Sequence, residues 1–432
     1  MARKPNILFI MTDQQRADHV GFMGNSVVQT PHLDGLAASG CVFENAWVSN
    51  PVCMPNRATI LTGRMPTAHG VIFNDRSLDW YANTFVRQLR ADGYRTALLG
   101  KSHLQHGMSR NAVVDFRGEG AVLSSEPAGW DQYEDFERYA DGLPEDPNDF
   151  YGFEKIALSI DHGARVTGHH LHWALERGAR REDLLTPHDH TAPGHKRSEE
   201  WWQIYEAPYE EQFHSTRFVT ERTQQFIQEC SEQDEPWMAL CSYPDPHHPV
   251  CPPGPWFDRH NSDDMPLPDS RHDSLEHAPA HLRIFQGVHP ANQRDWVAPC
   301  GYGNDRLLSQ AIAATYGMIE MVDDGVGQIL AQLEGLGVRD NTIIVFTSDH
   351  GDMMGDHGLF LKGFMHYRGT LQVPLVIDAP GLPALRTQGL SSSIDIAPTL
   401  LELCSLAGYD GIQGNSLAPM LSDGSARVRD HV

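Results

Sequence analysis

Three scarcities in the sequence each exclude a class of protein. Lysine and arginine together number 33 against 57 aspartate and glutamate residues, so the formal net charge is −24, and a basic surface for non-specific nucleic-acid binding is excluded. The apolar runs are short, and none approaches the roughly 20 residues of a membrane-spanning helix. Cysteine occurs only seven times, at scattered positions and in an odd number, which is not the pattern of a disulfide framework.

A secretory leader is not indicated either. Two basic residues precede the apolar run Ile7–Met11, but this run is shorter than the apolar core of a signal peptide. We therefore expect a cytoplasmic protein with neither nucleic-acid nor membrane partners. The 432 residues, 40% of them hydrophobic, suffice for one large domain, alone or with a small satellite. Formation of a homo-oligomer is left open.

Short apolar runs alternate with helical patterns along the chain. The runs suit strands buried on both faces, as in parallel sheets, and they are Ile7–Met11, Thr96–Leu99, Trp237–Cys241 and Thr342–Phe346. Apolar residues at helical spacing occur in Thr84–Asp92, His214–Glu229, Leu308–Leu333 and Asp395–Leu406. This alternation predicts an α/β fold. Because polar residues follow each run, we expect one composite site beyond the carboxyl ends of the strands.

The segment from about 105 to 212 is rich in charge, glycine, proline and histidine, with few periodic runs. It is interpreted as an insertion, either a lid or binding loop or a solvated or oligomer-contacting surface. Trp201, Trp202 and Tyr205 could line an aromatic or cation-binding pocket, although core packing is the commoner use. Seven histidines lie in this segment, at positions 162, 169, 170, 172, 188, 190 and 195. Two groups among them, His169-His170-Leu-His172 and His188-Asp-His190, raise the hypothesis of an accessory metal site, with a structural or pocket-lining role as the alternative.

Cys53 stands just ahead of a predicted helix. Pro55 suits the first helical turn, and Arg57–Leu61 can continue it. The free N–H groups and the dipole of a helix N-terminus stabilise an anion, so a thiol placed there is reactive. The alternative is a buried, inert cysteine, which is the usual fate of a lone one. The spacing alone only slightly favours a nucleophile.

The residues Cys53-Met-Pro-Asn-Arg57, followed by Leu61-Thr-Gly-Arg64, resemble the Cys-x-Pro-x-Arg signature of the formylglycine-dependent sulfatases. Further blocks similar to that family follow in its order, over essentially the whole chain: Asn6–Gln14, Gly100–His103, Pro246–Pro249, Thr347–Asp352, Lys362, Val373–Leu375 and Asp395–Thr399. Together they identify the chain as a member of the alkaline phosphatase superfamily, which also contains arylsulfatases, choline-sulfatases and phosphonate monoester hydrolases.

The resemblance implies an alkaline-phosphatase-like α/β fold, in which helices sandwich a large, mixed, mostly parallel sheet. It also implies that residues 1–400 form the catalytic domain, with the insertion at about 105–212. Sulfatases of this type usually continue into a small C-terminal subdomain of sheet and helix, and residues 401–432 correspond to its start. We therefore expect a truncated chain, with complete catalytic blocks and a largely absent C-terminal subdomain.

The resemblance further implies that a maturation enzyme oxidises Cys53 to formylglycine (3-oxoalanine), whose hydrate is the nucleophile. One divalent metal ion is expected in the site. Carboxylate and amide oxygens suit Ca²⁺, whereas a histidine nitrogen makes Mn²⁺ the alternative. The expected metal ligands are Asp13, Gln14, residue 53 (Cys53 after conversion), Asp349 and His350.

Cations and histidines complete the implied mechanism. Arg57 orients the hydrate, and one of its hydroxyls attacks the sulfur of a small sulfate ester. His247 and Lys362 assist the departing alcohol, and His103 then takes a proton from the other hydroxyl, so that sulfate leaves and the aldehyde returns. The expected substrate contacts are Lys101, His247, Lys362, His69 and Asn74. Among these five, His69 is expected mainly to support its neighbours.

Two other functions stay open. Gln14 and His350 stand where many sulfatases have aspartate and asparagine, and they resemble the phosphonate monoester hydrolases of the same superfamily. Lys101 and His103 oppose that function, because those hydrolases carry uncharged residues at these positions. If Cys53 is never converted, the protein is instead a non-catalytic binder of sulfated ligands.

Overall fold

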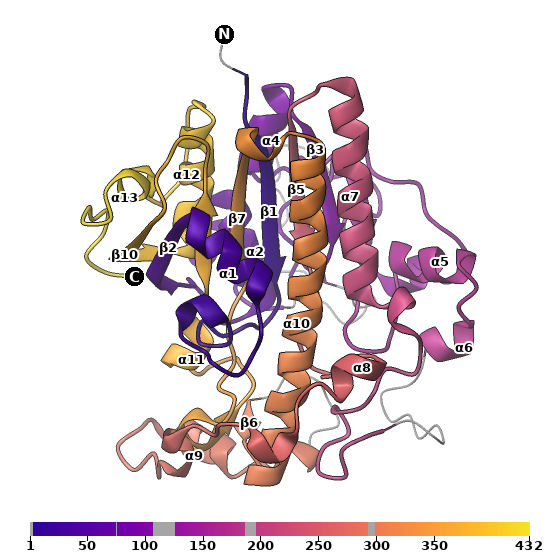
Figure 1. Cartoon of the computed structure of the whole chain (residues 1–432), viewed down its shortest axis with the longest axis vertical. Helices are drawn as coiled ribbons and strands as arrows, with labels where there is room; N and C mark the ends of the chain where they lie inside the picture. Colours follow the sequence, from indigo (N-terminus) through magenta and orange to yellow (C-terminus); the bar gives the residue numbers. More distant parts are fainter. Residues whose placement is uncertain (1–2, 75, 107–125, 186–195, 293–298) are drawn as a thin grey trace.

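A computed structural model describes residues 3–74, 76–106, 126–185, 196–292 and 299–432. In these ranges, helices lie on both faces of a central sheet (Figure 1). Its eight strands stand in the order β10-β2-β9-β7-β1-β5-β3-β4. Among them, β9 runs antiparallel to its neighbours β2 and β7, and the other pairs are parallel. The predicted α/β fold with a large, mixed, mostly parallel sheet is confirmed.

The strands of this sheet are β1 (Asn6–Thr12), β2 (Cys41–Trp47), β3 (Arg95–Gly100), β4 (Lys155–Leu158), β5 (Trp237–Ser242), β7 (Thr342–Ser348), β9 (Leu375–Asp378) and β10 (Leu385–Ser392). A separate antiparallel pair consists of β6 (Cys300–Gly301) and β8 (Leu359–Phe360). The helices are α1 (Pro31–Ser39), α2 (Cys53–Thr62), α3 (Pro66–His69), α4 (Phe85–Ala91), α5 (His169–Glu176), α6 (Arg181–Leu184), α7 (Ser215–Gln233), α8 (Gly254–Phe257), α9 (Ala280–Gln286), α10 (Asp305–Gly335), α11 (Arg368–Leu371), α12 (Ile396–Leu403) and α13 (Ala418–Ser422).

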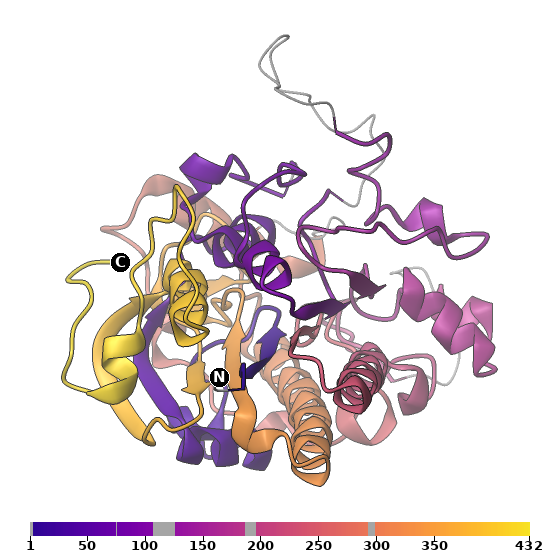
Figure 2. The same ribbon diagram turned by 90° about the horizontal axis from the view of Figure 1, so that it is seen from above.

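Strand β1 lies inside the sheet and is buried along its whole length. Because side chains alternate across a strand, Ile7 joins an apolar cluster with Met54 of α2, on one face. Leu8 joins a second cluster with Phe218 of α7 and Ile329 of α10, on the other face. Figure 2 shows the rose-coloured α7 and the orange α10 side by side on that second face. The continuous apolar runs therefore reflect strands covered by helices on both sides.

The predicted strands correspond to β1, β3, β5 and β7, and the predicted helices to α4, α7, α10 and α12. The sequence predicts an irregular insertion over 105–212, but part of that segment is regular. Strand β4 adds a parallel edge to the sheet beside β3, in register from Ala97 opposite Lys155. With only four residues, β4 is too short to show a periodic signal.

The chain beyond residue 400 remains packed on the same core. Leu417 and Met420 belong to the apolar cluster that contains Ile7. Arg429 donates a hydrogen bond of 2.8 Å to Oδ2 of Asp395, a carboxylate that is fully buried at the start of α12. The division of the chain at residue 400 stays a prediction.

No helix within the described ranges combines the length and the apolar character that crossing a membrane requires.

Gly100 ends β3 immediately before Lys101, at a φ of +112°, and a Cβ added there would lie 1.9 Å from the carbonyl oxygen of Ser242. We expect Gly100→Ala to lower the free energy of unfolding by about 3 kcal/mol, because β5 has to move and the backbone is strained. Chemical denaturation measures this change. Gly93→Ala is the matched control, since Gly93 also has a positive φ, +87°, but nothing lies within 4 Å of the added Cβ. Equal losses in the two variants would contradict the close approach.

Candidate active site

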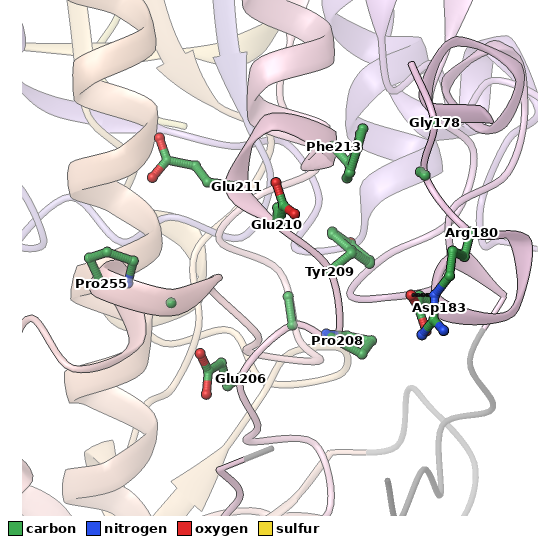
Figure 3. A pocket seen from close by; sticks show the side chains of 13 residues that line it. Gly178, Arg180, Asp183, Glu206, Pro208, Tyr209, Glu210, Glu211, Phe213 and Pro255 are labelled. Atoms are coloured by element: carbon green, nitrogen blue, oxygen red, sulfur yellow. Dashed lines mark hydrogen bonds and ion pairs between the residues drawn. The ribbon is translucent and has the colours of Figure 1, made fainter. Parts of the chain in front are cut away.

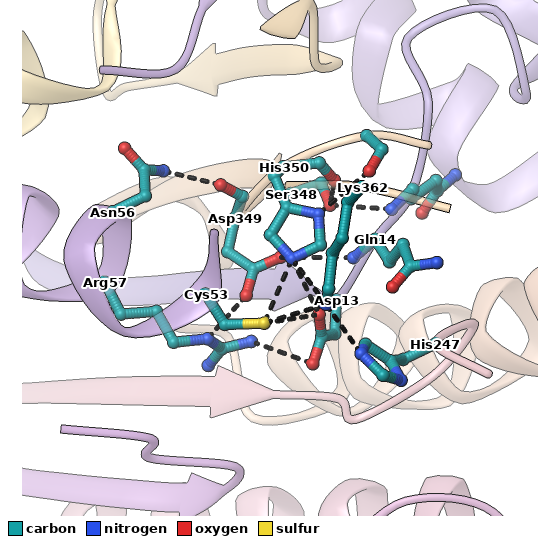
Figure 4. A network of polar contacts seen from close by, with 12 residues as sticks. Asp13, Gln14, Cys53, Asn56, Arg57, His247, Ser348, Asp349, His350 and Lys362 are labelled. Atoms are coloured by element: carbon teal, nitrogen blue, oxygen red, sulfur yellow. Dashed lines mark hydrogen bonds and ion pairs between the residues drawn. The ribbon is translucent and has the colours of Figure 1, made fainter. Parts of the chain in front are cut away.

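Several strands end at one edge of the sheet with the residues that the sequence singles out. Asp13 follows β1, Lys101 follows β3, and Asp349 follows β7. The loop after β5 supplies His247. Figure 4 shows these segments bringing Asp13, His247 and Asp349 together around the sulfur of Cys53. The composite site predicted at the carboxyl ends of the strands is therefore present as a cluster of side chains.

Cys53 is the first residue of α2 rather than the residue ahead of it. Its side chain is buried, with 1% of the residue exposed. The sulfur lies 3.0 Å from Nζ of Lys362 and 3.1 Å from Nε2 of His350. Burial and the Asp13 carboxylate raise the pKa of the Cys53 thiol, but Lys362, Lys101 and His350 together hold that pKa well below its usual value. Position 53 is thus surrounded by groups that stabilise negative charge.

Arg57 lies one turn further along α2 and is fully buried. Its Nε donates to Oδ2 of Asp349 at 2.7 Å, and its Nη1 donates to the backbone oxygen of Lys101 at 3.0 Å and to Oγ of Ser242 at 2.9 Å. Its Nη2 has no hydrogen-bond partner and lies 3.8 Å from Oδ2 of Asp13. Three strand ends therefore fix the guanidinium, and one of its nitrogens remains available to the site.

A donor set for a metal ion lies beside the sulfur. Ligand atoms of Asp13, Cys53, Asp349 and His350 all lie within 4.8 Å of one another, and all four residues are buried. Oε1 of Gln14 is a buried oxygen without a hydrogen-bond partner, which is costly unless a cation or a donor meets it. Two carboxylates, an amide oxygen and an imidazole nitrogen fit a hard divalent cation.

Gln14 is held by two residues that the sequence analysis did not assign to the site. Its Nε2 donates to Oδ2 of Asp352 and lies 3.0 Å from Nδ1 of His248. Because both partners contact the amide nitrogen, the amide oxygen Oε1 is the end of the side chain that has no hydrogen-bond partner. The sequence block Thr347–Asp352 already contained Asp352, but no spacing rule indicates its contact with Gln14.

Two lysines approach position 53 from different strand ends. Nζ of Lys362 lies 2.6 Å from Nε2 of His247 and 3.0 Å from Nε2 of His350. Nζ of Lys101 contacts Oδ2 of Asp13. Both lysines are buried, each with 1% exposed, so their charges act in a medium of low polarity, where electrostatic interactions are strong.

His103 is partly exposed and has a positive φ of 54°. Glu134 accepts its backbone N–H at 2.6 Å, while its Nδ1 is buried without a partner. Burial, reinforced by Lys101 and Arg57, holds the pKa of His103 well below its usual value. The ring is therefore neutral, with a nitrogen free to exchange a proton.

The two remaining predicted residues contact helix α2. Nε2 of His69 is 3.0 Å from Oγ1 of Thr59, and its Nδ1 accepts the backbone N–H of Val71 at 3.2 Å, so both ring nitrogens have partners within the protein. Oδ1 of Asn74 accepts the backbone N–H of Met54 at 3.1 Å. This hydrogen bond supports the N-terminus of α2. It uses the amide oxygen of Asn74 and leaves the amide nitrogen of the same side chain for other contacts.

His162 is a member of the cluster to which the sequence analysis gave no role. Its Nε2 contacts Nζ of Lys101 and lies 3.3 Å from Oδ2 of Asp13. Its ring stacks on that of His247, with centroids 3.9 Å apart. The histidine content of the insertion was the only signal, because the approach of residue 162 to β1 and β3 depends on the unrecognised strand β4.

The other clustered histidines of the insertion point to separate partners. His169 contacts Oδ1 of Asp146, Nε2 of His170 contacts the backbone oxygen of Phe213, and Nε2 of His172 contacts that of Tyr139. They do not converge as metal ligands, and His188, His190 and His195 lie outside the described residues. Trp201 packs on Phe360 in an apolar cluster; that cluster also holds Trp202, while Tyr205 belongs to another.

Comparison with known proteins agrees with this geometry. The family model described as Sulfatase matches residues 5–406. The chain belongs to the sulfatase family. It is therefore an enzyme of the class that hydrolyses sulfate esters, and its fold is that of the alkaline phosphatase superfamily.

Individual relatives cover almost the whole chain. An arylsulfatase of Clostridium perfringens is 30% identical over 439 residues, which span 99% of this chain and 81% of that protein. A choline-sulfatase of Rhizobium meliloti is 26% identical over 97% of this chain and 72% of its own length. Among solved structures, a phosphonate monoester hydrolase of Agrobacterium radiobacter has a TM-score of 0.76 and 27% identity, covering 98% of this chain and 78% of that one.

A cavity of about 600 Å³ lies elsewhere and shares no lining residue with the site. Figure 3 shows its acidic rim, to which Glu206, Glu210 and Glu211 contribute, and the ring of Tyr209 on its wall. Arg180 on the rim is already paired with Asp183 at 2.7 Å. This cavity is thus separate from position 53.

His162→Ala is expected to lower kcat for sulfate-ester hydrolysis about 10- to 100-fold, because Lys101 and His247 lose the ring that fixes them. Steady-state kinetics measure this change. The control is His172→Ala, a histidine of the same segment whose Nε2 contacts only the backbone oxygen of Tyr139, at 2.8 Å. We expect this control to retain the rate of the unsubstituted enzyme. A His162→Ala enzyme with unchanged kcat would remove His162 from the catalytic cluster.

Proposed function

We propose that this enzyme hydrolyses a sulfate monoester of a small alcohol, phenol or sugar to the free alcohol and inorganic sulfate. The observation that carries the proposal is the convergence of Arg57, Lys101 and Lys362 on position 53. Three buried cations around one nucleophile match a substrate whose transferring group carries negative charge. The match of the sulfatase family to residues 5–406 supports the same reaction class.

The nucleophile of the proposal is formylglycine, formed by oxidation of Cys53. In the converted protein, the two hydroxyl groups of the hydrated aldehyde would take the place of the Cys53 sulfur. One hydroxyl would attack the sulfate ester, and the other would be deprotonated. A maturation enzyme has to act before or during folding, because Cys53 is only 1% exposed within α2. The seven cysteines are all unpaired, which supports a reducing compartment such as the cytoplasm.

The metal ion of the proposal is Ca²⁺, with Mn²⁺ as the alternative. Asp13, Gln14, Asp349 and His350 would hold it, together with the converted residue 53. When bound, the ion polarises the sulfate and lowers the energy of negative charge on its oxygens. The unpartnered Oε1 of Gln14 and the two crowded carboxylates support this assignment.

The protein's own residues divide the remaining work. Arg57, tied to Asp349, orients the nucleophile. Lys362 and His247, 2.6 Å apart, face position 53 from the loops after β8 and β5 and assist the leaving oxygen. His103 keeps its Nδ1 free of partners and accepts the proton whose removal releases sulfate. Lys101 binds a sulfate oxygen.

Phosphonate monoester hydrolysis is the second candidate. The solved phosphonate monoester hydrolase with a TM-score of 0.76 favours it, as do Gln14 and His350. Lys101 and His103 favour the sulfatase, because they add a cation and a proton acceptor beside the nucleophile.

The sulfatase and phosphonate hydrolase activities are distinguished by comparing kcat/KM for two esters that share the same leaving group. We expect kcat/KM for an aryl sulfate to exceed that for the matching aryl phosphonate monoester by about 100-fold or more. Lys101→Met, which keeps the length of the side chain but removes its charge, is expected to narrow this ratio by lowering the sulfatase rate alone. A phosphonate preference of several orders of magnitude would overturn the proposal.

Removal of the metal ion tests the ligand set. Dialysis against a chelator is expected to abolish hydrolysis and to lower Tm by about 5 °C, because the bound ion stabilises the folded state and offsets the repulsion between Asp13 and Asp349. Differential scanning calorimetry and kinetics follow the two effects, and chelator saturated with Ca²⁺ is the control. Unchanged Tm and rate after complete metal removal would argue against this site.

A non-catalytic function is decided by the chemical state of position 53. Intact-mass analysis of the peptide that contains Cys53, from protein made in its native host, distinguishes the aldehyde or its hydrate from a thiol. The aldehyde is expected. An unmodified thiol there would favour a binder of sulfated ligands.

A further inference from the structure

Two aromatic rings lie stacked and exposed beside the nucleophile. Phe73 is 36% exposed and Phe364 is 56% exposed. Their ring planes are parallel within 1°, and the centroids are 5.7 Å apart. Phe73 lies in the loop after α3, and Phe364 lies in the loop after β8. Two distant parts of the sequence are thus joined at the surface by an apolar contact that leaves much of each ring in water.

Both loops also reach position 53. Asn74, the neighbour of Phe73, accepts the backbone N–H of Met54 at 3.1 Å. Lys362, two residues before Phe364, places Nζ 3.0 Å from the sulfur of Cys53. Since adjacent Cα atoms are about 3.8 Å apart, the Phe73 backbone lies within roughly 11 Å of the start of α2. The aromatic pair therefore belongs to the surroundings of the active site.

The loop of Phe73 and Asn74 connects the buried site to the surface, because Asn74 contacts the start of α2 while Phe73 is exposed. Cys53, Lys101 and Lys362 are buried, whereas Asn74 and His103 are only partly buried. A sulfate group that enters between the lysines leaves the rest of the ester directed toward this partly exposed side. The leaving group is thus the part of the substrate that meets the aromatic pair.

We propose that Phe73 and Phe364 form the subsite for the leaving group, and that this group is a flat aryl ring. The inference rests on the proposed sulfatase activity and specifies its substrate. Parallel rings at this separation form an offset stack, which a third ring can extend. Exposed apolar surface beside a catalytic group is typical of a binding site. An aryl ester offers a whole flat π face to these rings, whereas a sugar offers only the smaller C–H face of its ring.

The test measures binding of the leaving group and binding of the sulfate group separately. Phe73→Ala and Phe364→Ala are each expected to raise KM for 4-nitrophenyl sulfate about 10-fold, and the double variant about 100-fold. The inhibition constant of inorganic sulfate is expected to stay within about twofold, because sulfate binds at the lysines and the metal ion. Phe364→Tyr, which keeps the ring, is expected to retain the original KM.

Leu143→Ala is the matched control, since Leu143 is an equally exposed apolar side chain, at 53%, on another segment. Thermal unfolding checks that each variant folds. In the double variant, KM for a sugar 6-sulfate, tested beside the aryl ester, is expected to rise far less than KM for the aryl ester. Equal losses on both esters, an unchanged KM for the aryl ester, or weaker sulfate inhibition would each overturn the subsite. If the converted, unsubstituted enzyme hydrolyses no sulfate ester, the proposed function itself fails, and this result is distinct from a failure of the subsite alone.

Discussion

The ion pair between Arg57 and Asp349 is the contact on which the arrangement of the site depends. Both side chains are fully buried, and Nε and Oδ2 are 2.7 Å apart. A buried charge is tolerated only when it is paired and hydrogen-bonded, so neither residue can move independently of the other. Through Arg57 the start of α2 is also tied to the ends of β3 and β5, by the Lys101 carbonyl and the Ser242 hydroxyl. The orientation of Cys53, one helical turn away, follows from these bonds.

Much of the fold and site was predictable because buried parallel strands leave a strong local signal. The runs ending near Asp13, Lys101 and Asp349 have no polar interruption, and their carboxyl ends meet at one edge for topological reasons. The family blocks supplied the chemistry of Cys53, which spacing alone could not. In contrast, β4 has four residues and no distinguishing pattern. The approach of His162 to Lys101 depends on that strand, so it could not be read from local sequence.

The position of Gln14 illustrates a second limit. Its proposed role depends on which end of the amide is left without a partner, and that is decided by Asp352 and His248, which contact its nitrogen. Both residues lie more than 200 positions away along the chain. The overall charge of −24 is likewise a poor guide to the site, where the buried Lys101, Lys362 and Arg57 supply positive charge locally. Long-range contacts, rather than composition, determine the field that a substrate meets.

The order of the site residues along the chain has a consequence for biosynthesis. Cys53 and Lys362 touch, although 309 positions separate them. At about 5–20 residues per second, a ribosome needs roughly 15–60 s to synthesise that length. During this interval the signature around Cys53 has been made, but β7 and the Lys362 loop, which later enclose it, do not yet exist. Translation itself therefore provides a period of tens of seconds in which position 53 is chemically accessible, and the synthesis of the Lys362 loop brings that period to an end.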